Sequence, residues 1–247
     1  MARREGVPPP LAEDVLKRTV LAALLLALCV PQTADAGLRR VLLGHSHEGR
    51  PIRAHRLGDP ASEDVVLVVG CIHGNECAGT KVIAALKKRE PRGVKIWIID
   101  AVNPDGAAAG TRQNARGVDL NRNFPRGWRL QGTRWSTYYS GPRRASEKET
   151  RHAMRFIEEV RPDVTIWYHQ AMALVDRSGG RRAVQRRYAA MVGLPLRRLD
   201  PLPGTATRWQ NHRFDDSTAF VVELPGGELS WRSAKKHARA VVTVGKM

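Results

Sequence analysis

The chain has 247 residues, of which 42% are hydrophobic and 26% charged, and its formal net charge is +17 at pH 7. This length accommodates one α/β domain with a sizeable core, and no internal repeat, low-complexity tract or Gly/Ser linker favours a second domain. The charge favours anionic partners, and an anionic cell-wall polymer is one candidate. The basic residues are scattered pairs without interleaved aromatic residues, so we expect no specific binding of nucleic acid.

The N-terminal segment has the pattern of a signal peptide. Residues 19–30 are an uncharged apolar run that follows Lys17 and Arg18, and small residues precede a cleavage point expected after Ala36. The run is shorter than the roughly 20 apolar residues of a transmembrane helix. We therefore expect a signal peptide over residues 1–36 and a secreted or cell-envelope domain over residues 37–247, without stable membrane insertion after cleavage. An uncleaved anchor is the alternative, because the leader is long and contains acidic residues.

Hydrophobic periodicity and turn residues predict alternating strands and helices along the rest of the chain. Strands are expected over residues 38–43, 51–57, 65–69, 94–100, 163–169 and 219–224. Helices are expected over residues 80–88, 146–160, 180–192 and 230–244. Ser146 and Glu149 have the spacing of a capping box at the start of the second helix. The alternation predicts an α/β fold, with a mixed, largely parallel sheet flanked by helices.

Two long segments lack a sustained period, and we expect them to be loops. They cover residues 103–142 and 195–218. Long loops in a compact domain are more often functional than merely connecting, so the first segment is a place to look for substrate-binding side chains.

Polar side chains follow the apolar strand over residues 65–69, where the helix over residues 80–88 begins. In an open α/β sheet, ligands bind beyond the carboxyl ends of the strands. His73 and Glu76 lie at this edge, and their spacing lets an imidazole and a carboxylate converge on one point. Both are side chains that bind zinc, although the pair alone is weak evidence for a metal site.

Two further strands end on polar residues, His169 and Glu223. Two histidines and a glutamate with one open position form a catalytic zinc set, and an additional carboxylate beside it can act as a general base. A histidine or glutamate at a strand end is, on its own, more often a surface or paired side chain than part of a metal site. The occurrence of His169 and Glu223 together with His73 and Glu76 makes a metal site the better interpretation. We therefore predict one zinc ion per chain, bound by His73, Glu76 and His169, with Glu223 as the catalytic base.

Cys71 and Cys77 flank these proposed ligands. In an oxidising compartment they can form a disulfide, and the alternative is a pair of buried free thiols. The sequence does not give the Cα separation that decides between the two.

The first long loop contains arginines that can bind a carboxylate or stabilise an oxyanion. Here the sequence resembles the zinc carboxypeptidase family, of the carboxypeptidase A/B type, over about residues 38–245. The resemblance rests on five separated motifs in the family's order, which are His73-Gly-Asn-Glu76, Asn103-Pro-Asp-Gly106, Gly117-Val-Asp-Leu-Asn-Arg-Asn-Phe124, His169-Gln170 and Val222-Glu-Leu-Pro225.

The resemblance implies the same metal ligands and base, and it adds three roles in the loop. Asn121 and Arg122 match the family's clamp for the terminal carboxylate of the substrate. Arg112 resembles the arginine that supports the oxyanion, and Arg116 is the weaker candidate for that role. The implied substrate is a peptide, or a murein peptide, with a free carboxylate.

The chain departs from the larger family members because residues 195–218 contain no tyrosine that could cap the substrate. Its length and motifs resemble a compact bacterial branch, which includes an amidase that cuts the γ-D-glutamyl–diaminopimelate bond of murein peptides. We keep two alternatives. One is a deacylase similar to aspartoacylase or succinylglutamate desuccinylase, and the other is a non-catalytic module that binds the cell wall.

Overall fold

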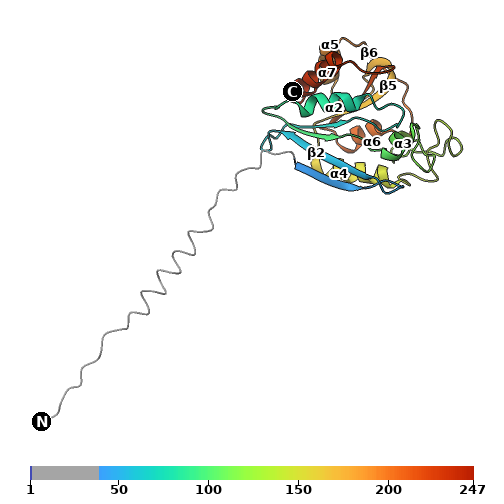
Figure 1. Ribbon diagram of the computed structural model, residues 1–247, viewed down its shortest axis with the longest axis horizontal. Coiled ribbons are helices and arrows are strands. Elements are labelled where there is room, and N and C mark those ends of the chain that lie inside the picture. Colours follow the sequence, from blue (N-terminus) through green and yellow to red (C-terminus); the bar gives the residue numbers. More distant parts are fainter. Residues whose placement is uncertain (2–38) are drawn as a thin grey trace. The chain divides into compact units, whose positions relative to one another are not determined.

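The computed structural model describes Met1 and residues 39–247 (Figure 1). The predicted signal peptide lies outside the described residues, so its removal and the domain boundary after residue 36 stay predictions. None of the helices within residues 39–247 is both long and apolar enough to cross a membrane.

A seven-stranded mixed sheet forms the centre of the fold. Its order is β1-β2-β4-β3-β5-β6, and β7 also pairs with β5. β1 with β2 and β2 with β4 are antiparallel, whereas β4, β3, β5, β6 and β7 pair in parallel. The predicted fold class is therefore confirmed. The strands are β1 (Arg39–His45), β2 (Pro51–Gly58), β3 (Val65–Val69), β4 (Lys95–Ile99), β5 (Val164–Asp176), β6 (Leu196–Arg197) and β7 (Thr218–Pro225).

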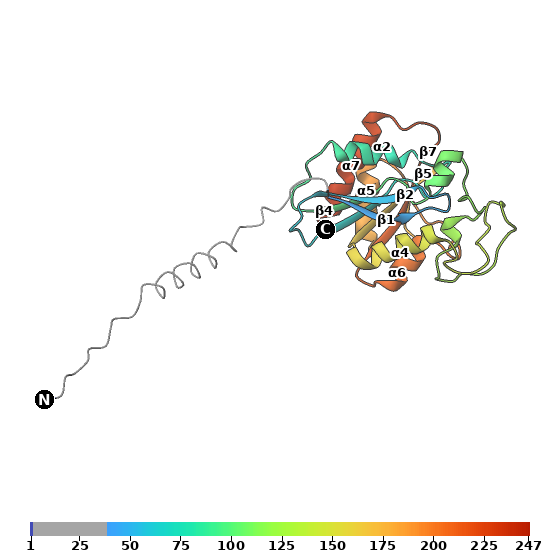
Figure 2. The same ribbon diagram turned by 60° about the horizontal axis from the view of Figure 1, so that its bottom comes forward.

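Helices cover both faces of the sheet (Figure 2). One face packs against α2 (Gly79–Lys87), α5 (Arg182–Val192) and α7 (Trp231–Val244), and the other against α4 (Lys148–Val160) and α6 (Ala206–Arg213). β3 is buried on both sides, with Val66 and Val68 in one core cluster and Leu67 and Val69 in the other. A strand that is buried on both faces is a continuous run of apolar residues, and β3 could be predicted from the sequence for this reason.

The structure corrects the two predicted loops. Residues 103–142 contain α3 (Pro104–Ala109) and the 3₁₀ turn η1 (Leu120–Arg122), and residues 195–218 contain β6 and α6. α3, η1 and β6 are too short to show a hydrophobic period. In α6 (ATRWQNHR) most residues are polar, so its helical period is weak in the sequence.

The predicted capping box at α4 is wrong. The helix begins at Lys148, and its N-cap residue Glu147 makes no side-chain capping bond. The Ser146 hydroxyl donates to Glu147, while the buried Glu149 carboxylate accepts from the backbone N–H of His47 at 2.9 Å. Glu149 thus joins α4 to the β1–β2 hairpin, a long-range contact that the local sequence does not reveal.

A buried polar chain connects the sheet with α5 and α7. The Tyr168 and Tyr188 hydroxyls lie 2.6 Å apart, and the Tyr188 hydroxyl lies 2.8 Å from Nδ1 of His237. All three side chains are buried. Burial, assisted by the nearby charge of Lys236, lowers the pKa of His237 to about 4.

This shift predicts a pH-dependent contribution to stability. His237 is neutral in the folded state down to about pH 4, whereas in the unfolded chain it binds a proton near its ordinary pKa of 6.5. The free energy of unfolding should therefore fall as the pH is lowered from about 6.5 to 4, by about 3 kcal/mol from this group. Measured by urea unfolding, the free energy of unfolding should differ less between pH 7 and pH 4 for His237→Gln than for the wild type. Equal pH dependence of the two proteins would contradict the assignment.

Candidate active site

The turn after β3 is shaped by a glycine and a disulfide. A Cβ atom on Gly74 would lie 1.9 Å from the carbonyl carbon of Gly106, so only glycine lets this turn pack against α3. Cys71 and Cys77 form a disulfide, with their Cα atoms 4.7 Å apart. The alternative left open by the sequence is thereby decided, and the disulfide closes the turn that contains the two proposed ligands.

The turn and the β5 strand bring His73, Glu76 and His169 together as predicted, but the predicted end of that strand at His169 is wrong, because β5 continues to Asp176. Nδ1 of His73 and Nδ1 of His169 lie 3.0 and 2.9 Å from Oε2 of Glu76, and 3.1 Å from each other. The potential ligand atoms all lie within 4.8 Å of one another. Two imidazole nitrogens and one carboxylate oxygen facing a common point form a donor set that fits zinc.

Asp119 is a site residue that the sequence did not identify. Its Oδ1 lies 2.9 Å from Nε2 of His73, and its Oδ2 accepts from Nε and Nη2 of Arg112 at 3.1 and 3.0 Å. Burial disfavours its negative charge, but His73 and Arg112 outweigh burial and keep the pKa of Asp119 below its ordinary value. A carboxylate bonded to the outer nitrogen of a metal-binding histidine fixes the ring and its tautomer.

Arg112 lies directly beside the proposed metal ligands. Its Nη1 donates to Oε1 of Glu76 at 2.6 Å, while the rest of the guanidinium contacts Asp119. The side chain of Arg116 is 45% exposed and lies 3.6 Å from Glu147, away from these groups. The structure thus favours Arg112 over Arg116 as the arginine near the reacting carbonyl, although the role itself stays a prediction.

Asn121 and Arg122 lie in η1, next to this cluster. Nη1 of Arg122 donates to the Asn121 carbonyl at 2.6 Å, but its buried Nε has no hydrogen-bond partner among residues 39–247. Burial lowers the pKa of Arg122, although Asp119 opposes this effect. The Asn121 side chain accepts from the backbone of Ala206 and lies 3.5 Å from His169. A buried guanidinium with an unpaired N–H is suited to an anionic ligand.

An aromatic side chain covers the two arginines. Tyr138 is 49% exposed, and its ring lies 4.8 Å from the guanidinium of Arg122 and 5.9 Å from that of Arg112. Tyr138 thus places an aromatic ring beside the site, although residues 195–218 contain no tyrosine. No hydrophobic period around Tyr138 predicts this placement.

Glu223 lies on β7 opposite His169 in the parallel register. Its Oε2 is buried and has no hydrogen-bond partner within the described part of the chain. Burial, together with the nearby charge of Glu76, raises the pKa of Glu223 to about 7. A carboxyl group with a pKa near neutrality can both accept and return a proton, which is the property required of a general base.

Comparison with known proteins decides the family. The model of the zinc carboxypeptidase family matches residues 32–181. The chain belongs to this family. It is a family of hydrolases, so the expectation of an enzyme and the resemblance seen in the motifs are confirmed.

Two curated relatives of this zinc carboxypeptidase family member are murein peptide amidases A. The Escherichia coli K12 protein is 31% identical over 153 residues, covering 54% of this chain and 62% of the relative. The Vibrio campbellii protein is 30% identical over 175 residues, covering 64% of this chain and 68% of the relative. The crystal structure of a murein-tripeptide amidase from E. coli O157 has the same fold, with a TM-score of 0.71 and 23% identity, covering 87% of this chain and 94% of the other. The match to the K12 relative thus spans less than two thirds of that protein.

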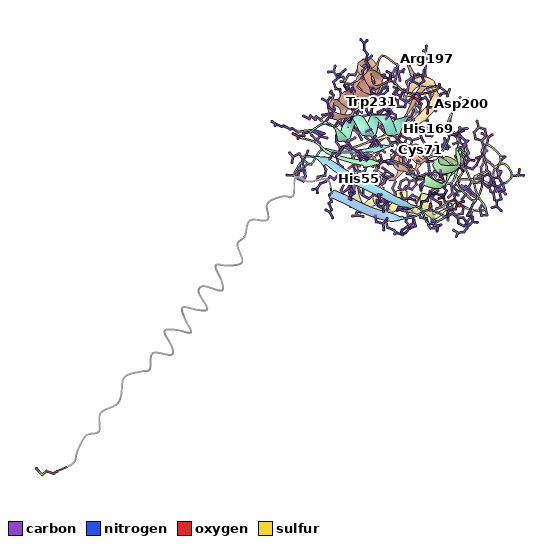
Figure 3. The ribbon with its side chains drawn as sticks, viewed as in Figure 1. His55, Cys71, His169, Arg197, Asp200 and Trp231 are labelled. Carbon is purple, nitrogen blue, oxygen red and sulfur yellow. A yellow bond between two sulfur atoms is a disulfide. The ribbon has the colours of Figure 1, made fainter. Side chains whose placement is uncertain are left out.

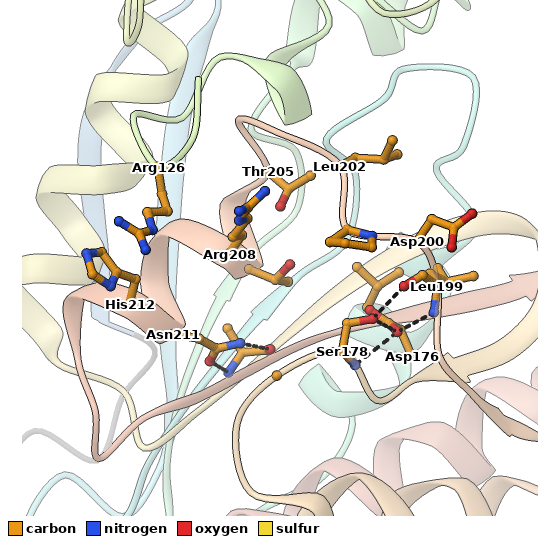
Figure 4. A pocket seen from close by; sticks show the side chains of 15 residues that line it. Arg126, Asp176, Ser178, Leu199, Asp200, Leu202, Thr205, Arg208, Asn211 and His212 are labelled. Carbon is orange, nitrogen blue, oxygen red and sulfur yellow. Dashed lines mark hydrogen bonds between the residues drawn. The ribbon is translucent and has the colours of Figure 1, made fainter. Parts of the chain in front are cut away.

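A pocket lies near Asn121, on the side of α6 and the loop before it (Figure 4). It has a volume of about 390 Å³ and extends past Thr205, whose neighbour Ala206 bonds Asn121. Arg126 and Arg208 lie on one side and Asp200 on the other (Figure 4). The pocket therefore presents both positive and negative groups to a side chain that enters it.

The Asp119–His73 contact predicts weaker zinc binding when the carboxylate is neutralised. Asp119→Asn should lower zinc affinity by about 10- to 100-fold, because an amide supports the His73 ring less well than a carboxylate. Competition with a fluorescent chelator measures this affinity. Asp176→Asn is the matched control, since Asp176 is also buried and accepts a backbone hydrogen bond, from Leu199 at 3.0 Å. Equal affinities for wild type and Asp119→Asn would contradict the proposed support.

Proposed function

We propose that this protein is a secreted, zinc-dependent amidase that cleaves an amide bond next to a free carboxylate in murein peptides. The observation that carries the proposal is Arg122, a buried guanidinium with an unpaired Nε close to the His73, Glu76 and His169 cluster. The match to murein peptide amidases supports the substrate class. The signal-peptide pattern of residues 1–36 supports export.

The chemistry of the proposed reaction divides among few residues. His73, Glu76 and His169 would bind the zinc ion, which when bound supplies a Lewis acid that polarises the scissile carbonyl. Glu223 takes a proton from the attacking water at its unpaired Oε2, and returns it to the leaving nitrogen as the C–N bond breaks.

Arginine side chains supply the electrostatic part of the reaction. The Arg112 guanidinium, fixed by Glu76 and Asp119, stabilises the negative charge that develops on the carbonyl oxygen. Arg122 and Asn121 bind the free carboxylate, which places the neighbouring amide at the metal site.

The mixed charge of the pocket supports diaminopimelate as the leaving residue. In the substrate one of its nitrogens forms the scissile amide, and its side chain ends in an ammonium and a second carboxylate, both of which need partners when the side chain leaves water. Arg126 and Arg208 offer partners for that carboxylate, and Asp200 offers a partner for the ammonium (Figure 4). An apolar C-terminal residue would leave these charges without partners, so we propose selectivity for diaminopimelate over phenylalanine.

The proposed function is tested by removing either the free carboxylate of the substrate or the arginine that would bind it. L-Ala-γ-D-Glu-diaminopimelate should be hydrolysed, and the same peptide with its terminal carboxylate amidated should not. Arg122→Ala should cost about 2 to 5 kcal/mol in kcat/KM for the free acid, while the Arg116→Ala control should retain wild-type values. Cleavage of the amidated peptide as fast as the free acid would overturn the proposal. Preferential hydrolysis of N-acyl amino acids would favour the deacylase alternative.

The charged pocket is tested by a substrate that lacks one charge. Lysine is diaminopimelate without its second carboxylate, so L-Ala-γ-D-Glu-Lys isolates the contribution of that group. Arg208→Glu should lower the ratio of kcat/KM for the diaminopimelate peptide to that for the lysine peptide by about tenfold, because it replaces attraction by repulsion. Arg213→Glu, also exposed on α6 but paired with Glu158 outside the pocket, should leave the ratio unchanged. A ratio unaffected by Arg208→Glu would exclude this pocket from recognition.

A further inference from the structure

Three helices gather positive charge on one side of the molecule. α2, α5 and α7 cover the same face of the sheet (Figure 2), and none of them contains Asp or Glu. By contrast, α4 on the opposite face has three acidic and three basic residues. The basic residues of the three helices are Lys81, Lys87, Arg182, Arg186, Arg187, Arg232, Lys235, Lys236 and Arg239.

The fold thus brings together on one side of the molecule basic residues that are scattered in pairs along the sequence. We call these three helices, with Lys88 and Arg89 at the end of α2, the basic face. All of its Lys and Arg side chains except that of Lys81 are exposed.

Few of these charges have anionic partners. Within residues 39–247, the ion pairs of the basic face are Lys87 with Asp100 at 2.9 Å and Lys81 with Glu228 at 3.9 Å. Packed helices lie about 8–10 Å apart, which is close to the Debye length of about 8 Å at physiological ionic strength, so the fields of neighbouring helices add. Such a surface attracts an extended polyanion more than a small anion.

A groove with an aromatic wall lies within the basic face. It occupies about 460 Å³ between α2 and α7, and it is lined by Ala85, Lys88, Arg89, Trp231 and Lys235. The side chain of Trp231 is 43% exposed (Figure 3). Nζ of Lys88 lies 4.8 Å from its ring centroid, so the indole and the cations present one mixed surface.

We propose that the basic face binds an acidic polysaccharide, with one sugar unit stacked on Trp231 in the groove. The C–H face of a pyranose ring packs well on an indole, and its acidic substituents would then meet Lys88, Arg89 and Lys235. The groove lies at the C-terminal end of α2, the end of the helix away from the turn that contains His73 and Glu76. This inference is independent of the proposed catalytic reaction.

Two other polyanions fit the basic face less well. Trp231 is the one exposed large apolar side chain that the structure describes on these three helices, which gives little apolar area to insert into a bilayer. Single-stranded nucleic acid is usually bound by successive aromatic platforms, and the groove has one.

The proposal is tested by comparing polygalacturonate, a polymer of acidic sugars, with poly-L-glutamate, which has the charge but no sugar ring. Affinities are measured by isothermal titration calorimetry at low salt with the whole chain. Trp231→Ala should weaken polygalacturonate binding about tenfold and leave poly-L-glutamate binding unchanged, because only the sugar polymer loses a stacking partner. The Lys235→Glu/Lys236→Glu variant should weaken the binding of both polymers about tenfold or more.

Matched variants on other surfaces serve as controls. Trp135→Ala removes a tryptophan that is 51% exposed, and Arg151→Glu/Arg155→Glu reverses two charges on α4. Neither should change the affinity for polygalacturonate. The proposal is overturned if polygalacturonate does not bind, if the α4 variant weakens binding as much as the α7 variant, or if Trp231→Ala has no effect. Tighter binding to phosphatidylglycerol vesicles or to DNA than to polygalacturonate would also overturn it.

Discussion

The arrangement of the active site depends on one buried negative charge, the carboxylate of Asp119. An isolated carboxylate in this position would be strongly unfavourable, and the charge is stable here because His73 and Arg112 both bind it. Each of these two partners also contacts Glu76. Asp119 orients His73 so that its other nitrogen faces Glu76 and His169, and it orients Arg112 so that its guanidinium reaches Glu76. The proposed metal ligand His73 and Arg112, the arginine proposed to stabilise the oxyanion, are thus aligned by the same side chain.

The loop that contains Asp119 is ordered by side chains instead of a regular backbone ladder. Asn103 accepts from the N–H of Gly106, Asn114 accepts from the N–H groups of Arg116 and Val118, and Asn123 donates to the carbonyl of Ser140. These buried asparagines satisfy backbone groups that a helix or strand would otherwise pair. This explains how residues without hydrophobic periodicity place Arg112, Asp119, Asn121 and Arg122 accurately.

The difference between regular strands and a loop ordered by side chains explains which site residues could be predicted from the sequence and which could not. His73 was found because it follows β3, a strand that is apolar throughout and buried on both faces. His169 was found because it comes directly after the buried first half of β5, although the strand continues past it to Asp176. Asp119 was missed because its partner His73 lies 46 residues away and no local pattern connects them. Tyr138 and the basic face are products of tertiary packing, since their members become neighbours only when the loop and the three helices pack.

The active site and the basic face use charge in different ways. In the site, Asp119 is buried and paired with His73 and with the half-buried Arg112, and Arg122 is buried next to them, so the positions of these charges are fixed before substrate arrives. On α5 and α7 the basic side chains are exposed, and within residues 39–247 they have no acidic partners. Fixed charges suit catalysis, whereas exposed charges suit adjustable, salt-sensitive binding of a polymer.

His73, which Asp119 orients, should bind zinc together with Glu76 and His169. Zinc K-edge X-ray absorption of the protein loaded with one equivalent of zinc tests it most directly. We predict a ligand shell of two imidazole nitrogens and light oxygen ligands at about 2.0–2.2 Å, without sulfur, because Cys71 and Cys77 are joined to each other. A sulfur ligand at about 2.3 Å, or a shell without two imidazoles, would contradict the account.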